Sequence, residues 1–414
     1  MARFNTPSLL VALVSVSLLL LASSADAQCS GNRRVRKEFN DLSQAEVKSL
    51  QDGIRAIYTT GKIKPFVDMH IQLASEAHNT PQFLLWHRVM VYNYETLLLQ
   101  NAPGLQGLPY FDATYSYSDP GSSFIFRDDV LGSANPAGGC LGAPFQDIKD
   151  PNGQCVQRQG QRGFTLYSPQ LLLSTLQNSP DYVAAERAIE MGPHAGTHNF
   201  INGNMGNVLF SPTDPIFWHH HGAVDYWWAQ YQGLNNNANM NLYGGVHKGK
   251  EVSMSDMFDK YQASQVLDYY NTFCYSYQQP RNAPQGKVPF AKGSTDATPV
   301  PVPGSNSTTP PTTQPLISIP SNLTDDFIKN FNLNATLAGK ARELMLLFVG
   351  RLNDRISKGE KLPTLADLAS FQKAATPASD SIATATPTHS GASSVASSVL
   401  GAIVAVLALA VGMQ

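Results

Sequence analysis

Apolar side chains recur at helical spacing in several parts of the chain, and this pattern predicts a mainly helical fold. The strongest example is FLLWHRVMVYNYETLLL, residues 83–99, which begins shortly after Pro81. A second amphipathic stretch places Leu344, Phe348 and Leu352 on one helical face. Segments rich in Gly, Pro and Asn interrupt the chain before residue 279, so we expect long loops and few short strands.

Two stretches are apolar along their whole length, one near each end of the chain. Residues 9–22 follow Arg3 and precede the small residues ADA, so residues 1–27 are predicted to be a cleaved secretory signal rather than a membrane anchor. At the other end, SSVLGAIVAVLALAVGMQ has an apolar run shorter than the roughly 20 residues of a spanning helix. Small residues and a polar spacer precede it, in the order of a GPI-attachment signal: Ser390, Gly391 and Ala392.

These two ends predict a secreted protein that is attached to the cell surface or cell wall by a GPI anchor. The membrane would then be a partner only through this C-terminal lipid. A tail anchor and a cleaved propeptide are the alternatives for the apolar tail.

Composition divides the chain between these ends. Residues 28–279 are rich in aromatic side chains and are numerous enough to form one domain with its own hydrophobic core. Residues 280–321 contain TPVPVPGSNSTTPPTTQP, a linker that cannot bury a core. Residues 322–374 regain helical patterning and are expected to form a small helical segment. Residues 375–414 form the Ser/Thr-rich spacer and the tail.

Cysteines and sequons agree with secretion. The four cysteines allow three pairings, of which we favour Cys140 with Cys155, closing a short loop, and Cys29 with Cys274, stapling the ends of the domain. Three sequons predict glycosylation sites at Asn306, Asn322 and Asn334.

The charge balance narrows the class of partner. The formal net charge is -2 and charged residues make up 14% of the chain. A basic surface is not indicated, so we expect no nucleic-acid partner. The oligomeric state stays open.

Eight of the ten histidines fall in three places along the chain. They are His70, His78 and His87, then His194 and His198, then the triplet His219, His220 and His221. His194 and His198 are four residues apart and share one face of a helix, so both can reach one metal ion. His247 and His389 stand apart and are expected to be solvated.

The spacings favour two sites of three imidazoles each, on four antiparallel helices. Neighbouring residues on a helix point about 100° apart, so one ligand is the sensible limit within the triplet. Asp225 lies one turn beyond His221 and could accept the second N–H of that imidazole. An all-imidazole set suits copper or zinc and disfavours calcium or magnesium. The alternative, that the histidines merely pack in the core, is much weaker for six than for one.

Two long motifs resemble the copper signatures of a known family. HNTPQFLLWHRVMVYNYE, residues 78–95, is similar to the first signature of tyrosinases, catechol oxidases and molluscan haemocyanins. DPIFWHHHGAVD, residues 214–225, is similar to the second. RVRKEFNDLSQAEV at 34–47 and CYSY at 274–277 resemble the segments that open and close the family's catalytic domain. The resemblance covers residues 29–279.

The resemblance implies a four-helix-bundle core with a dinuclear type-3 copper centre that binds O2 as co-substrate. Such enzymes oxidise small phenols, converting o-diphenols to o-quinones, and some first hydroxylate monophenols; the quinones feed melanin formation or wall cross-linking. By position, the first copper takes His70, His78 and His87, and the second takes His194, His198 and His221. His220 matches a family histidine that is usually not a ligand. Four aromatic residues are expected to line a dry wall or simply pack in the core: Phe83, Trp86, Phe217 and Trp218.

Several positions depart from the family pattern or bear on the substrate. Glu76 stands where many fungal members have a cysteine that forms a thioether with the second histidine of the first copper site, so this cross-link is absent. Ala195 stands where monophenol-active members often have Asn, which is thought to hold a water together with a nearby glutamate. Glu190 or Glu186 could be that glutamate.

Two further positions border the site. Asn199 follows the second histidine of the second copper site, and the small Val208 occupies a gate position that is often bulky. Together with Ala195, they predict strong diphenol oxidation and weaker monophenol hydroxylation.

Two other functions, and a regulatory role for residues 322–374, are also compatible with parts of the sequence. An oxygen carrier or a catalytically silent surface protein would keep the copper centre. A di-zinc hydrolase usually has bridging carboxylates, and these motifs contain none. In the family a C-terminal extension can plug the site until proteolysis, so residues 322–374 suggest latency, with a simple stalk as the alternative.

Overall fold

The computed structural model describes Cys29, residues 33–281, residues 320–321 and 324–330, and scattered positions between 346 and 358. The predicted signal, most of the linker, the three sequon asparagines and the apolar tail lie outside the described residues. Within them, no helix combines the length and apolar character needed to cross a membrane.

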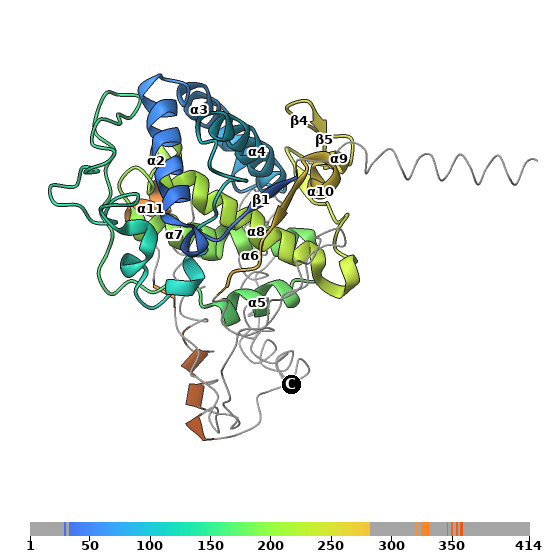
Figure 1. Ribbon diagram of the computed structural model, residues 1–414. Coiled ribbons are helices and arrows are strands. Elements are labelled where there is room, and N and C mark those ends of the chain that lie inside the picture. The colour runs from blue at the N-terminus through green and yellow to red at the C-terminus, as the bar shows by residue number, and fades with distance from the viewer. Residues whose placement is uncertain are drawn as a thin grey trace, which may run out of the picture.

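Four helical units form the centre of the domain (Figure 1). They are α3 (Lys64–Ala77), α4 (Phe83–Asn101), α8 (Ile216–Asn237) and a continuous unit made of α6 (Tyr182–Ile189), η5 (Glu190–His194) and α7 (Ala195–Ile201). The helix α4 contacts α3 and α8, and α8 contacts α6. The fold class predicted from the sequence, mainly α with few short strands, is confirmed.

The remaining elements surround this centre. The helix α2 (Gln44–Thr59) packs on α4 and begins with a capping box between Ser43 and Glu46. The other described helices are α5 (Pro169–Gln177), α9 (Ala263–Leu267), α10 (Tyr269–Thr272) and α11 (Asp325–Asn330), and short 3-10 turns occur at Phe39–Asp41, Ala113–Ser116, Pro120–Ser122, Phe124–Phe126 and Ser211–Thr213.

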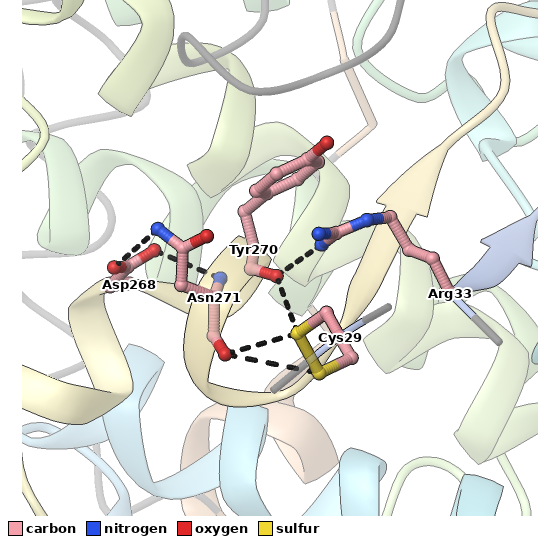
Figure 2. The surroundings of a disulfide bond; sticks show 6 residues. Cys29, Arg33, Asp268, Tyr270 and Asn271 are labelled. Carbon is pink, nitrogen blue, oxygen red and sulfur yellow. Dashed lines mark hydrogen bonds between the residues drawn. A yellow bond between two sulfur atoms is a disulfide. The ribbon is translucent and has the colours of Figure 1, made fainter. Parts of the chain in front are cut away.

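A short parallel pair of strands joins the two ends of the domain. The strand β1 (Arg34–Arg36) pairs with β6 (Tyr275–Tyr277). Next to this pair a disulfide links Cys29 to Cys274, with Cα atoms 5.4 Å apart. Figure 2 shows its surroundings, where the guanidinium of Arg33 donates to the backbone carbonyl of Tyr270. A second disulfide joins Cys140 to Cys155, so the structure contains both predicted pairings.

Two small antiparallel hairpins complete the strands. One pairs β2 (Val246–His247) with β3 (Lys250–Glu251), and the other pairs β4 (Met257–Phe258) with β5 (Tyr261–Gln262).

The helical unit that carries His194 and His198 is irregular at one point. Residues Glu190–His194 form a π-turn, which contains Pro193. Proline has no backbone N–H to donate, and a wider turn is a common response inside an α-helix. The irregularity places His194 at the junction with α7, and His198 follows one turn later on α7.

Candidate metal centre

The first three predicted histidines lie together in the interior. His70 comes from α3, His78 ends that helix, and His87 comes from α4. Their ring centroids are 5.0 Å apart for His70 and His78, 4.9 Å for His78 and His87, and 5.8 Å for His70 and His87. One nitrogen of each lies within 4.8 Å of the others. We call this set the first trio.

The second set lies on the opposite pair of helical units. His194 and His198 have ring centroids 4.6 Å apart, and His221 on α8 lies 5.0 Å from His194. The Nε2 atoms of His198 and His221 are 3.2 Å apart. We call these three residues the second trio. All six histidines of the two trios are at most 7% exposed.

The two trios face each other. The rings of His87 and His221 are stacked, with centroids 4.5 Å apart and planes 19° apart. Phe83 lies 4.7 Å from His87 and 4.8 Å from His194, and Phe217 lies 4.1 Å from His221 and 5.3 Å from His70. Aromatic rings therefore border both trios and exclude water from the space around them.

Trp86 and Trp218 differ in position. Trp86 lies 4.9 Å from His87 and borders the first trio as expected. Trp218 instead stacks on Tyr94 at 4.0 Å and donates its indole N–H to Tyr58. Its ring belongs to the packed core between α8, α4 and α2.

Backbone carbonyls hold four of the six imidazoles by the same nitrogen. The Nδ1 atoms of His78, His87, His194 and His198 lie 2.7–3.0 Å from the carbonyl oxygens of Ala74, Phe83, Glu190 and Met205. A carbonyl accepts, so Nδ1 carries the proton and Nε2 keeps its lone pair. The Nε2 atoms of His87 and His194 are buried without a hydrogen-bond partner in the described part of the chain.

Burial keeps these rings neutral. It lowers the pKa of His78 and of His198 to about 4, and lowers the pKa of His70, His87, His194 and His221 well below the ordinary value. A neutral imidazole is the form that binds a transition metal, and orphaned nitrogen atoms in a dry interior are costly unless something pairs with them. The residues present therefore fit a pair of copper ions, each held by one trio.

The remaining histidines of the triplet occupy different surroundings. The Nδ1 of His219 lies 2.7 Å from the carbonyl of Pro109, away from both trios. His220 is fully buried, its ring is parallel to that of His194 at 5.4 Å, and neither ring nitrogen has a hydrogen-bond partner among the described residues. One of its nitrogens lies within reach of the second trio. His220 therefore approaches the second trio more closely than one ligand per triplet would predict.

The expected hydrogen bond between Asp225 and His221 is wrong. The Asp225 carboxylate accepts from Arg36 at 2.9 Å, and also from Arg88, Tyr275 and Tyr277. The Nδ1 of His221 has no partner among the described residues. Two guanidinium groups and two phenols stabilise a buried carboxylate better than one neutral imidazole does, because they supply positive charge and several hydrogen-bond donors. Asp225 therefore points toward them.

The two candidate glutamates lie together beside the trios. The Glu190 carboxylate accepts the backbone N–H of Asn79 at 2.7 Å and lies 3.4 Å from Arg187. Glu186 is fully buried and neither carboxylate oxygen meets a hydrogen-bond partner in the described residues. Burial, and secondarily the charge of Glu190, raise the pKa of Glu186 well above its ordinary value, so Glu186 is the neutral member of the pair.

The three remaining predicted residues differ in their surroundings. Ala195 is buried directly after His194, and Val208 is half-buried. Asn199 is buried, and its side-chain oxygen accepts both the backbone N–H of Thr324 at 2.9 Å and the hydroxyl of Thr324 at 2.7 Å. A segment after the linker therefore touches the residue that follows His198.

One prediction about an isolated histidine is wrong. His247 was expected to be solvated, but its Nε2 lies 2.8 Å from the Glu76 carboxylate and its side chain is 15% exposed. The hairpin that carries it folds back onto α3, a long-range contact that spacing along the sequence does not reveal. His389 lies outside the described residues.

Comparison with known proteins agrees with this arrangement. Residues 60–234 match the model of the common central domain of tyrosinase. The chain is 30% identical over 217 residues to the tyrosinase-like protein tyr-3 of Caenorhabditis elegans, covering 48% of this chain and 31% of that protein. It is 26% identical over 312 residues to the tyrosinase-like protein phomQ2 of Diaporthe leptostromiformis, covering 64% of this chain and 79% of that protein.

A solved structure shows the same fold. A polyphenol oxidase from Thermothelomyces thermophila superposes with a TM-score of 0.52 at 21% identity, covering 60% of this chain and 90% of that one. The matched central domain contains every histidine of both trios, and the superposed fold is the helical core in which they lie. The central region of the chain, residues 60–234, therefore belongs to the tyrosinase family of type-3 dicopper proteins.

Proposed function

We propose that the protein is a secreted, copper-dependent oxidase that converts o-diphenols to o-quinones with O2, attached to the cell surface or wall through a C-terminal lipid anchor. The observation that carries the oxidase proposal is the face-to-face arrangement of the two trios, with His87 stacked on His221. A single three-histidine site would support many reactions, whereas two that face each other support two-electron chemistry with dioxygen.

The copper pair, when bound, supplies the electron transfer by which two o-diphenols and one O2 become two o-quinones and two waters. The chain's own residues prepare the space for this. Backbone carbonyls fix the tautomer of four imidazoles, so the nitrogen lone pairs are oriented before the metal arrives. Phe83 and Phe217 exclude water beside both trios.

Glu190 is proposed to accept the phenolic proton. Burial raises the pKa of Glu190 above its ordinary value, but Arg187 and the Asn79 N–H oppose this shift, so Glu190 ionises more readily than Glu186. Its backbone carbonyl lies 2.9 Å from Nδ1 of His194 and its carboxylate accepts the N–H of Asn79, which follows His78, so the residue lies between the two trios. Ala195 offers no side-chain amide to orient a water beside this carboxylate, which supports weaker hydroxylation of monophenols.

The segment after the linker is proposed to hold the enzyme latent. The backbone N–H of Ser321 donates to the Thr165 carbonyl at 2.8 Å, and the Ser321 hydroxyl oxygen accepts the Thr165 N–H at 2.7 Å. The hydroxyl of Thr324 donates to the side-chain oxygen of Asn199, which follows His198. Since Asn199 directly follows His198, a segment docked on it is proposed to obstruct a phenol that approaches the second trio.

Oxygen uptake tests the proposed oxidase directly. The copper-loaded protein should consume O2 with a catechol and respond slowly, after a lag, to a monophenol. Ready turnover of both would remove the argument from Ala195. If two coppers bind O2 but neither phenol is oxidised, even after the C-terminal segment is removed, the protein is an oxygen-binding or silent member instead.

A further inference from the structure

The β2–β3 hairpin reaches the helix end that carries His78. Its turn contains Lys248 and Gly249, both with positive φ, 48° and 77°. The Nε2 of His247 lies 2.8 Å from one Glu76 oxygen, and the ammonium of Lys248 pairs with the other. Both oxygens of this carboxylate, two residues before His78, are therefore occupied by the hairpin.

Glu76 is also tied to the loop that follows His78. Its backbone carbonyl accepts the Thr80 hydroxyl at 2.8 Å, and the same hydroxyl oxygen accepts the backbone N–H of Gln82 at 3.2 Å. His78 itself leaves the helix in an extended conformation, with φ -124° and ψ 148°. It therefore stands at the junction between α3, where the Ala74 carbonyl accepts its backbone N–H, and this loop.

A second contact joins the base of the hairpin to the same loop. Gly245 has a φ of 113°, and a Cβ at this position would lie 2.7 Å from Cγ of Pro81 and 3.1 Å from Val183. The hairpin closes with the Val252 N–H donating to the Gly245 carbonyl at 3.0 Å. The backbone of the hairpin is thus in close contact with the segment between His78 and α4.

We infer that the hairpin formed by residues 245–252 is a clamp that positions His78 through Glu76, so that the first trio retains its metal only as firmly as this clamp holds. The inference rests on the proposed function, because copper is the metal that the trio would hold. His70 and His87 project from regular helices, whereas His78 ends α3 in an extended conformation, held by Ala74 of its own helix and followed by the loop that the hairpin contacts. Glu76, His247 and Lys248 act as positioning residues.

Hydrogen–deuterium exchange of the metal-free protein tests the clamp without copper. Glu76→Gln and Lys248→Met should each make the backbone amides of residues 78–82 exchange about fivefold faster, the scale expected for a partly exposed ion pair. Lys248→Arg keeps the cation and should match the wild type. Asp68→Asn is the matched control, since it removes an exposed ion pair with Lys64 on the same helix. Wild-type exchange in both Glu76→Gln and Lys248→Met would overturn the clamp.

Copper release provides the second measurement. In competition with a chelator, one of the two ions should leave about fivefold faster from Glu76→Gln and Lys248→Met, while the other leaves at the wild-type rate. Both ions leaving at the wild-type rate would overturn the inference. A wild-type protein that takes up no copper would refute the proposed function instead, and the exchange measurement would still decide whether the clamp exists.

Discussion

The backbone N–H of Asn79 donates to the Glu190 carboxylate across 2.7 Å, although the two residues belong to opposite halves of the metal centre. Asn79 follows His78 of the first trio and has a φ of 55°, which asparagine tolerates better than most residues. The carbonyl of Glu190 accepts from His194 of the second trio. One residue therefore fixes both trios relative to each other, in addition to its proposed role as a base.

Exchanging the two glutamates for glutamine separates these roles. Glu190→Gln keeps an oxygen that can accept the Asn79 N–H but cannot take a proton, so copper content should stay at two while phenol turnover falls by about a hundredfold. Glu186→Gln replaces a neutral acid by a neutral amide and should change turnover little. Steady-state kinetics and metal analysis of both variants check this. Equal losses in the two would mean that the pair acts as one unit.

The neighbours His220 and His221 are expected to differ in metal binding. His221→Gln should reduce the copper content from two ions to one, because His221 belongs to the second trio and faces His87. His220→Gln should retain both ions and pack normally. Metal analysis of the purified variants, with the electron paramagnetic resonance of partly oxidised samples, gives the result. Loss of an ion in His220→Gln alone would exchange the two assignments.

Asp225 is expected to be among the most sensitive positions for stability. Its carboxylate is 4% exposed overall and pairs with the fully buried Arg36 and Arg88. Asp225→Asn would remove the carboxylate that pairs with Arg88 and leave Arg36 with Glu95, at a cost of about 3–5 kcal/mol in the free energy of unfolding. Urea unfolding measures it. Asp129→Asn, which breaks the exposed pair with Arg127, should cost less than about 1 kcal/mol.

The metal-free protein should lose stability as the pH falls from about 6.5 toward 4. Burial lowers the pKa of His78, His198 and His219 to about 4 in the folded state, against about 6.5 in an unfolded chain. Between these values the unfolded state binds more protons, so each histidine removes about 1.4 kcal/mol per pH unit. Unfolding midpoints at pH 7.5, 6 and 5 test this. The variant His219→Leu should show a shallower slope, and an unchanged slope would contradict the assignment.

Removing the C-terminal segment should raise turnover. Residues 29–279 should oxidise catechol several-fold faster than residues 29–374, because the contacts of Ser321 and Thr324 with the domain are lost. Thr324→Val in the longer chain removes one of the two hydrogen bonds to Asn199 and should act in the same direction. Oxygen uptake compares the three proteins, and equal rates for all of them would reduce the segment to a stalk.

Local spacing explains what could be predicted from the sequence. The interval from His194 to His198 and the apolar run around His87 depend on neighbouring residues, and the structure keeps both. The short loop of Cys140 and Cys155 is equally local. Even here, Pro193 widened one turn, which a uniform helical period does not describe.

Long-range polar contacts could not be predicted in the same way. The partners of Asp225 come from residues 36, 88, 275 and 277, and those of Glu76 come from a hairpin near residue 248. Side chains of these types occur throughout the chain, and periodicity carries no information about which of them meet. Only the fold decides that Asp225 meets arginines rather than the imidazole four residues before it.

The paired strands β1 and β6, together with the disulfide Cys29–Cys274, bring the first residues of the domain beside its last strand. Because these strands are parallel, the chain leaves β6 beside Asp41, at the end of β1 away from Cys29, so a crossover linker of about a dozen residues or more would be needed to join residue 281 to Cys29. New ends could then be opened in the exposed turn at residues 151–153, far along the chain from every histidine of the trios. Such a circular permutant should still assemble both trios, because the order in which the helices are joined matters less than their packing.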